Sequence, residues 1–252
     1  MSTHSRYEPF VPLCLRVLKH FWPDHPELLL FSDAGRFEHP GKVLSPARSW
    51  VTMLSECLAT SLEQGRLTED EHVLLLLEDH IPHARVDGRA IEWFSQSLRV
   101  HEDTYVGLFE VDHLGAGRGE VVSKGAEFAL HRFDLPNFSS LHPAVWSVRH
   151  LRRTLARAEE LKQTSPWQFE YVRISGVTHY VSGAGAWESP HGGFLYQGKV
   201  NIPALRSMRE GPLRTLRRRL LWRLVPEVPG RIARRLRDLG RSGNRWGSVP
   251  RR

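Results

Sequence analysis

The sequence contains only two cysteines, Cys14 and Cys57, among its 252 residues. Both lie in apolar helical patterns, and their spacing matches neither a metal-binding motif nor a disulfide framework. We therefore expect a reducing, cytoplasmic setting. No stretch approaches the roughly 18–20 unbroken apolar residues of a membrane-spanning helix, and no signal-peptide pattern opens the chain. These shortages leave a globular protein without an internal membrane span as the expected class.

The net positive charge of the chain comes from its C-terminal fifth. Residues 205–252 carry fifteen arginines and three acidic residues, a net charge of +12, whereas the whole chain carries +7. Residues 1–204 therefore sum to −5 and, with 40% hydrophobic residues overall, have the length of one large α/β domain. We expect a basic, partly disordered tail over 205–252, with amphipathic helices near 213–224 and 232–239.

The most informative stretch is the apolar run 73–77, which ends at the adjacent carboxylates Glu78 and Asp79. A continuous apolar run of this length predicts a strand buried on both faces. Ligands of α/β sheets bind beyond the carboxyl ends of such strands. Two carboxylates there could hold Mn²⁺ or Mg²⁺, and through the cation a diphosphate. The alternative is that they begin a solvated turn before Pro82.

Hydrophobic periodicity predicts alternating helices and strands in the first half, an order that requires a mainly parallel sheet flanked by helices. The predicted elements are a helix over 7–21, a strand over 27–32, a helix capped by Ser45, a strand over 72–78, a helix over 88–99 and a strand over 103–111. The second half is predicted to be looser. It has an edge strand at 128–133, a long helix opening at 141–146, and short antiparallel strands near 170–174, 178–182 and 193–200.

Several motifs, taken in this order, resemble the bacterial GT-A-type glycosyltransferases of polysaccharide biosynthesis. The resemblance covers roughly residues 5–204, and its most specific part is the pairing of the last two motifs around one helix. The motifs are Arg6-Tyr7, Trp22-Pro23, Phe31-Ser32-Asp33, Ser49-Trp50, Leu77-Glu78-Asp79-His80, His142-Pro143-Ala144-Val145-Trp146 and Ser165-Pro166-Trp167-Gln168-Phe169-Glu170.

The resemblance implies a GT-A-like fold that binds a nucleotide-sugar donor and transfers the sugar to a glycan or lipid-linked polysaccharide precursor. It implies that Glu78 and Asp79 bind the divalent metal and the diphosphate, and that Glu170 is the general base. The remaining implied positions are Arg6, Asp33 and Trp50 on the donor side, and Trp146 and Trp167 on the acceptor side.

Each assignment has a structural alternative. Trp146 could belong to the core, Glu170 could face solvent, and Arg6 could simply be a charged residue at a helix start. Residues 1–5 are shorter and more polar than the first strand of such folds, so we expect that strand to be missing or to begin upstream. The acidic motif reads Glu-Asp-His, a departure from Asp-x-Asp that weakens the metal assignment.

Three functions compete at this stage. The first is a glycosyltransferase at the cytoplasmic face of the membrane, which its tail would hold against anionic lipid. The second is a catalytically inactive binding or scaffold protein on the same fold. Nucleic-acid binding comes last because the tail has only Trp222 and Trp246 as base-stacking aromatics, and the body is acidic.

Overall fold

The computed structural model describes most of the first 188 residues and a few short segments beyond them. The described residues are 1–3, 7–33, 35, 37–100, 105–108, 121–125, 127–133, 141–175, 179–182, 186–188, 195–196, 199–201 and 213–215. The chain divides into two units, Met1–Ser189 and Pro190–Arg252. In the second unit, β10 (Leu195–Tyr196) and β11 (Lys199–Val200) form an antiparallel pair, as predicted near 193–200.

The predicted tail falls almost entirely outside the described residues. Residues 213–215 are helical, and the rest of the predicted helices at 213–224 and 232–239 lies beyond what the structure describes. Among the described helices, none is both long enough and apolar enough to cross a membrane.

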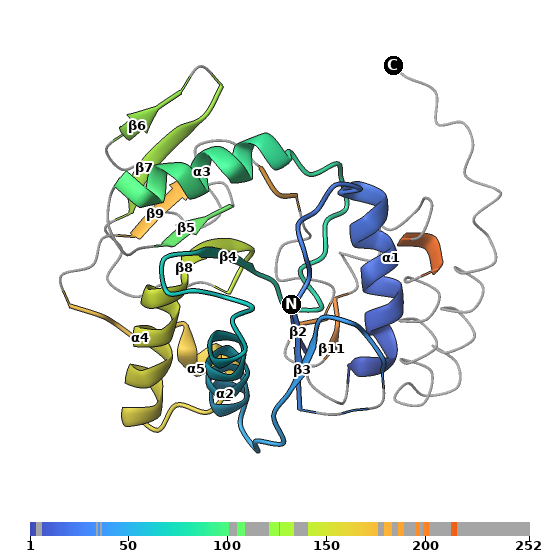
Figure 1. Ribbon diagram of the computed structural model, residues 1–252. Helices are drawn as coiled ribbons and strands as arrows, with labels where there is room; N and C mark the ends of the chain where they lie inside the picture. The colour runs from blue at the N-terminus through green and yellow to red at the C-terminus, as the bar shows by residue number, and fades with distance from the viewer. Residues whose placement is uncertain are drawn as a thin grey trace. The chain divides into compact units, whose positions relative to one another are not determined.

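The first unit is a mixed α/β structure in which helices pack on sheets (Figure 1). Its helices are η1 (Glu8–Phe10), α1 (Val11–Phe21), α2 (Trp50–Glu63), α3 (Gly88–Val100), α4 (Val148–Glu160) and α5 (Pro166–Phe169). Its strands are β1 (Ser2–Thr3), β2 (Leu30–Ser32), β3 (Lys42–Leu44), β4 (His72–Leu75), β5 (Tyr105–Gly107), β6 (Val121–Lys124), β7 (Ala129–Phe133), β8 (Ala144–Ser147) and β9 (His179–Ser182).

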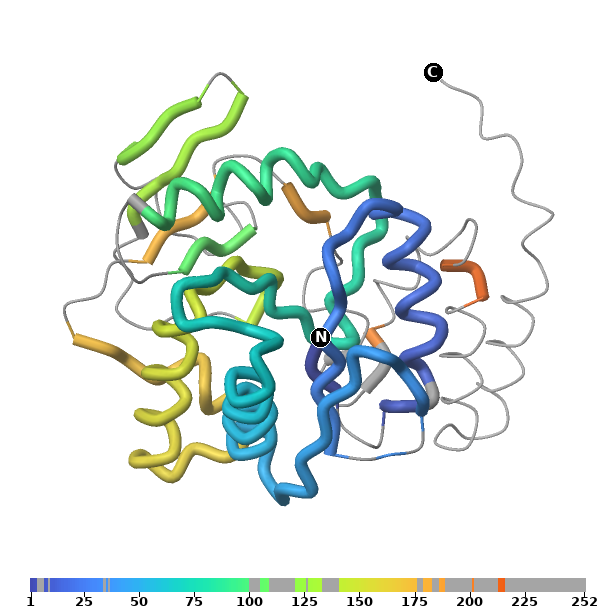
Figure 2. Tube along the Cα trace, in the orientation of Figure 1, coloured from blue at the N-terminus to red at the C-terminus, as the bar shows by residue number. Residues whose placement is uncertain are grey.

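Residues 2–3, in the segment that is shorter and more polar than the first strand of GT-A-like folds, form the two-residue strand β1. It pairs in parallel with β2, which pairs in parallel with β3, and an isolated parallel bridge joins Ser2 to Leu77 just beyond β4 (Figure 2). Strand pairing depends on main-chain groups, so a short polar segment can serve where its side chains are satisfied. The buried Ser2 hydroxyl accepts a hydrogen bond of 2.9 Å from Nε1 of Trp50, which supplies that satisfaction.

The prediction of a mainly parallel sheet is wrong for the main sheet. This sheet has six strands in the order β4-β8-β5-β9-β7-β6, and only β5 and β9 pair in parallel. The expected edge strand at 128–133 is the internal strand β7, and β6 forms the edge. The error arose at 141–146, because β8 inserts between β4 and β5 and is antiparallel to both.

Side-chain alternation along β8 assigns helices to the two faces of this sheet. Trp146 packs into a core cluster with residues of α2, α4 and α5, whereas Val145 faces the side on which α3 lies. Figure 1 shows α2 and α4 side by side below the sheet and α3 across it. The two faces of the sheet are therefore covered by different helices. The core cluster lies on the α2–α4 face, and the α3 face borders a cavity.

Two helices begin later in the chain than predicted. Helix α2 begins after Ser49, whose hydroxyl accepts the Thr52 N–H, while Ser45 contacts Glu56 instead. The long helix predicted from 141–146 begins at Val148, after the Ser147 cap. Serine before an apolar run predicts a cap, but it does not select among neighbouring serines.

Candidate functional site

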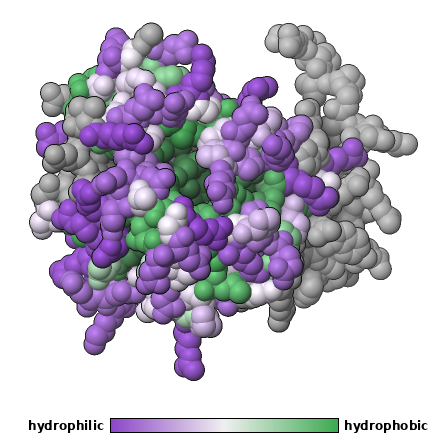
Figure 3. Space-filling model, viewed as in Figure 1, coloured by the Kyte–Doolittle hydropathy of each residue, from purple (hydrophilic) through white to green (hydrophobic). Residues whose placement is uncertain are grey.

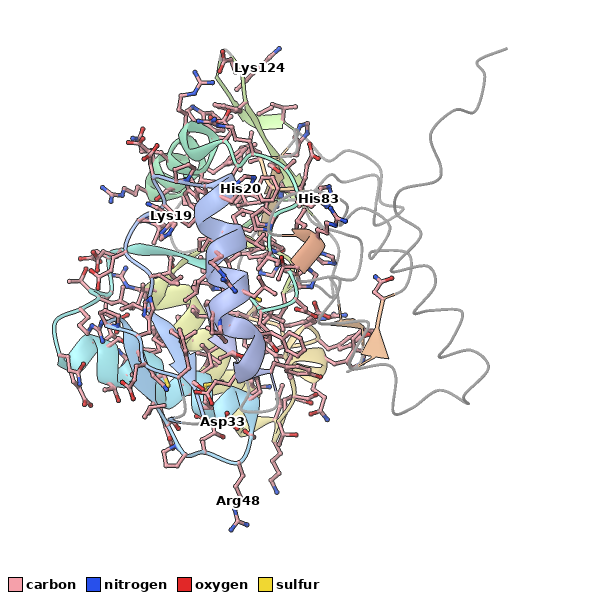
Figure 4. The ribbon with its side chains drawn as sticks, turned by 90° about the vertical axis from the view of Figure 1, so that its right-hand side faces the viewer. Lys19, His20, Asp33, Arg48, His83 and Lys124 are labelled. Atoms are coloured by element: carbon pink, nitrogen blue, oxygen red, sulfur yellow. The ribbon has the colours of Figure 1, made fainter. Side chains whose placement is uncertain are left out.

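The parallel arrangement of β1, β2 and the Leu77 segment brings their carboxyl ends to the same edge. Asp33 directly follows β2, and Glu78 directly follows Leu77, so both acidic motifs lie at this edge, as predicted. Figure 4 shows Asp33 beyond the strands, near the N-terminal end of α1, whereas Lys19 and His20 lie toward the other end of that helix. Arg6, the remaining predicted residue at this edge, lies outside the described residues.

Glu78 and Asp79 form a buried acidic pair. Burial raises the pKa of Asp79 from 3.8 to about 7. Burial also raises the pKa of Glu78 well above its ordinary value, and the charges of Asp79 and Asp33 raise it further. Oδ1 of Asp79 has no hydrogen-bond partner among the described residues, and Nε2 of His80 lies 4.0 Å from it. Like charges held together out of water destabilise a fold and are typical of functional sites.

Glu170 reaches the same region from a segment ninety residues further along the chain. Helix α5 positions it through a capping box, in which Ser165 and Gln168 exchange hydrogen bonds. Its Oε1 accepts the Leu141 N–H at 2.8 Å. Burial raises the pKa of Glu170, the Leu141 hydrogen bond opposes this, and the charge of Asp79 raises it further. Glu170 is therefore within electrostatic influence of Asp79.

The sequence analysis did not assign roles to the groups that surround this cluster. The ring of His142 lies 4.7 Å from that of His80, measured between centroids. Trp187 is buried and donates its Nε1–H to the His80 carbonyl at 3.1 Å, which fixes the chain just after the acidic pair. His142 stands inside the quoted motif 142–146 and could have been noticed there. Trp187 had no recognisable signal in the sequence.

The three predicted tryptophans separate into two groups. Trp50 and Trp146 belong to the core, and Trp146 is 0% exposed, which favours the structural alternative over acceptor binding. Trp167, in contrast, is 54% exposed and contacts the half-exposed Tyr171 edge to face at 5.7 Å. Both flank Glu170 in sequence, so the predicted base is bracketed by an exposed aromatic pair.

The donor atoms at the acidic edge suit a hard cation only in part. Among the described residues, no group of three or more His, Cys, Asp or Glu side chains is arranged to hold a metal ion. Two adjacent carboxylates are present, and Mg²⁺ sites in phosphate-transferring enzymes often use one or two carboxylates with substrate phosphates. The acidic edge therefore fits a cation that arrives with, or is completed by, a diphosphate.

Comparison with protein-family models and with curated protein sequences found no match to this chain.

A large cavity lies elsewhere in the first unit. It measures about 1070 Å³ and opens between α3 and the chain that follows α1. Leu74 and Val145 are among its apolar lining, with Arg85 and Arg99 also lining it. Figure 3 shows apolar surface at the bottom of a hollow rimmed by hydrophilic residues. None of the predicted site residues lines it, so size alone does not mark the chemistry.

Proposed function

We propose that this chain is a glycosyltransferase that moves a sugar from a nucleotide-sugar donor to a glycan or lipid-linked precursor. The observation that carries the proposal is the electrostatic clustering of Asp33, Glu78, Asp79 and Glu170. These acids come from three separate segments: Asp33 and the Glu78–Asp79 pair follow parallel-paired strands, and Glu170 follows helix α5. Such an arrangement costs stability, and it suits a site that binds a cation and moves a proton.

The chemistry assigns different tasks to the acids. A sugar hydroxyl is too weak an acid to attack unaided, so a carboxylate must accept its proton as the new bond forms. Glu170 suits this task because its raised pKa makes it a stronger base than an ordinary glutamate, and the Leu141 N–H holds one of its oxygens in place. The exposed Trp167–Tyr171 pair would present aromatic faces to the acceptor beside it.

Glu78 and Asp79 would hold a divalent cation together with the donor diphosphate. When bound, the cation would offset the negative charge that develops on the departing nucleoside diphosphate. Proton uptake competes with cation binding at this pair, because burial raises the pKa of Asp79 to about 7. Donor binding should therefore strengthen as pH rises from 6 to 8.

The fold supports the proposal at a coarser level. Strands β1, β2 and β3 run in parallel, and the Ser2–Leu77 bridge aligns the segment before Glu78 with them. The GT-A resemblance implies a mixed, mainly parallel sheet, and the small parallel sheet with acids beyond its strands agrees with part of that expectation. The mostly antiparallel main sheet restricts the parallel part to fewer strands than the resemblance led us to expect.

The test is a panel of nucleotide sugars, assayed for hydrolysis and for a thermal shift with and without Mn²⁺. We expect at least one donor to stabilise the protein in a Mn²⁺-dependent manner and to be turned over slowly. Absence of both effects with every donor, at pH 8 where Asp79 is mostly ionised, would overturn the proposal.

The second candidate is an inactive binding protein on the same fold. It is favoured by the absence of a three-ligand metal group among the described residues. This candidate predicts a Mn²⁺-independent thermal shift with a nucleoside diphosphate, without turnover. The two candidates are therefore separated by the same panel.

We further propose that the basic tail holds the protein against anionic lipid. The motive is the leucine pattern at 213–224, interspersed with five arginines. Basic residues near an anionic leaflet contribute about 1 kcal/mol each. Replacing these five arginines with glutamine should abolish cosedimentation with phosphatidylserine vesicles at low salt. Unchanged cosedimentation would contradict this role.

A further inference from the structure

A buried ion pair joins the segment that follows β1 to the segment that follows β2. Glu8, at the start of η1, lies 3.3 Å from Nζ of Lys42, the first residue of β3. The exposed fractions of the two side chains are 3% and 9%. Burying two charges costs free energy unless they are paired with each other and hydrogen-bonded. Removing one partner should therefore cost far more stability here than at an exposed surface ion pair.

The same pair holds the main chain of the β2–β3 connection, residues 33–41. Oε1 of Glu8 accepts the Phe37 N–H at 2.8 Å, and Nζ of Lys42 donates to the Phe37 carbonyl. Both main-chain polar groups of Phe37 are therefore bound by one buried ion pair. We call this arrangement the Glu8–Lys42 latch.

The far end of the connection is fixed by close packing. A Cβ atom on Gly41 would lie 1.9 Å from the Leu28 carbonyl oxygen, so only glycine fits there. The Gly41 carbonyl also accepts the Leu30 N–H at 2.8 Å. With Gly41 and Phe37 both anchored, Asp33 occupies the short part of the connection between the latch and β2.

Asp33 directly follows β2 at the acidic edge, and its charge raises the pKa of Glu78. The latch itself lies close in sequence to Arg6-Tyr7, the motif that the resemblance placed at the nucleotide. One buried contact therefore fixes the β2–β3 connection against the start of η1.

We propose that Glu8 and Lys42 are positioning residues for donor binding: they hold the β2–β3 connection, and Asp33 with it, at the nucleotide end of the acidic edge. This inference rests on the proposed function. Neither residue needs to touch the donor. Loss of the latch should weaken donor affinity without affecting the step that Glu170 performs.

The test uses the double variant Glu8→Met with Lys42→Met. Replacing a buried ion pair by apolar residues of similar volume is often neutral for stability, whereas removing one partner strands the other charge. We expect the double variant to fold, its dissociation constant for the best nucleoside diphosphate with Mn²⁺ to rise at least tenfold, and kcat at saturating donor to stay within threefold. Hydrogen exchange at the Phe37 amide should accelerate more than tenfold.

Two further variants serve as controls. Glu8→Gln combined with Lys42→Met keeps an oxygen that can accept the Phe37 N–H and leaves no stranded charge, so it should keep exchange at that amide slow and donor affinity within threefold of wild type. Arg157→Met with Glu160→Met removes an exposed ion pair of α4 by the same substitutions and should change neither quantity.

The outcomes separate this inference from the proposed function. Donor affinity within twofold of wild type in a folded Glu8→Met, Lys42→Met protein would overturn the positioning role alone. A wild-type protein that binds no nucleoside diphosphate would overturn the proposed function and, with it, the positioning role. In that case Phe37 exchange would still show whether the latch holds the connection.

Discussion

Replacing Asp79 with asparagine should stabilise the fold while removing the proposed activity. The native pKa of about 7 lies above the ordinary value of 3.8, so the native state keeps a proton that the unfolded state releases. Stability therefore falls as pH rises from about 4 to 7. At 1.36 kcal/mol per pKa unit, the penalty is roughly 2 kcal/mol at pH 5 and roughly 4 kcal/mol above pH 7. Because 17% of the side chain is exposed, these values are upper limits.

The assay is thermal unfolding of wild type and Asp79→Asn at pH 5 and pH 8.5, without added metal. One kcal/mol shifts Tm by roughly 2–4 °C at this chain length, so we expect the variant to unfold several degrees higher at pH 8.5. The advantage should shrink to about half or less at pH 5. Donor binding and Mn²⁺ dependence should be lost at both pH values.

The matched control is Asp70→Asn, which removes a carboxylate that precedes the same strand, is 85% exposed and pairs with Arg149. This exposed ion pair is worth no more than about 1 kcal/mol, so the control should change Tm little. A destabilised Asp79→Asn protein at pH 8.5, or an advantage independent of pH, would refute the description of Asp79 as a strained buried acid.

Three further predictions follow from the same structure. Glu170→Gln should lower turnover by roughly 10²–10⁴-fold with donor affinity unchanged, since the amide can still accept the Leu141 N–H. If calorimetry shows that donor binding is lost in parallel, the assignment of Glu170 to the acceptor side is wrong. Burial lowers the pKa of His150 from 6.5 to about 3, so between pH 8 and pH 5 only the unfolded state takes up a proton. The stability advantage of His150→Phe over wild type should therefore be about 2 kcal/mol larger at pH 5 than at pH 8. A pH-independent difference in urea unfolding would contradict this. Trp50→Phe should destabilise the protein by roughly 1–3 kcal/mol, because it removes the buried hydrogen bond to Ser2. A loss of stability below about 0.5 kcal/mol would show that this bond does not hold β1 in place.

Local elements of the fold could be predicted where periodicity and end signals agreed. The helices at α1 and α3 match their predicted ranges closely, because each carries a regular apolar stripe and a clear end such as Trp22-Pro23. The strand at 72–78 was also found, although its regular part is His72–Leu75. In these segments the local pattern and the tertiary packing favour the same structure.

Other elements were decided by partners that a sequence pattern does not name. Ala144–Ser147 reads as the first turn of a long helix, yet it is a strand because β4 and β5 provide main-chain partners on both of its edges. Ser2–Thr3 is a strand for the same reason, despite its polarity. Pairing between distant segments satisfies buried N–H and C=O groups, and that requirement can override local preference.

The proposed site shows the same division between sequence and tertiary structure. The sequence alone determined that Glu78 and Asp79 follow an apolar strand, whereas the capped turn before Glu170 was found only in the structure. Only the tertiary structure decided that these acids influence one another, because the strengths of their interactions depend on burial and on distances between segments far apart in the chain. It also decided that Trp146 is core and Trp167 is surface, since an indole suits either environment and only the packing of α2, α4 and α5 closes over the first.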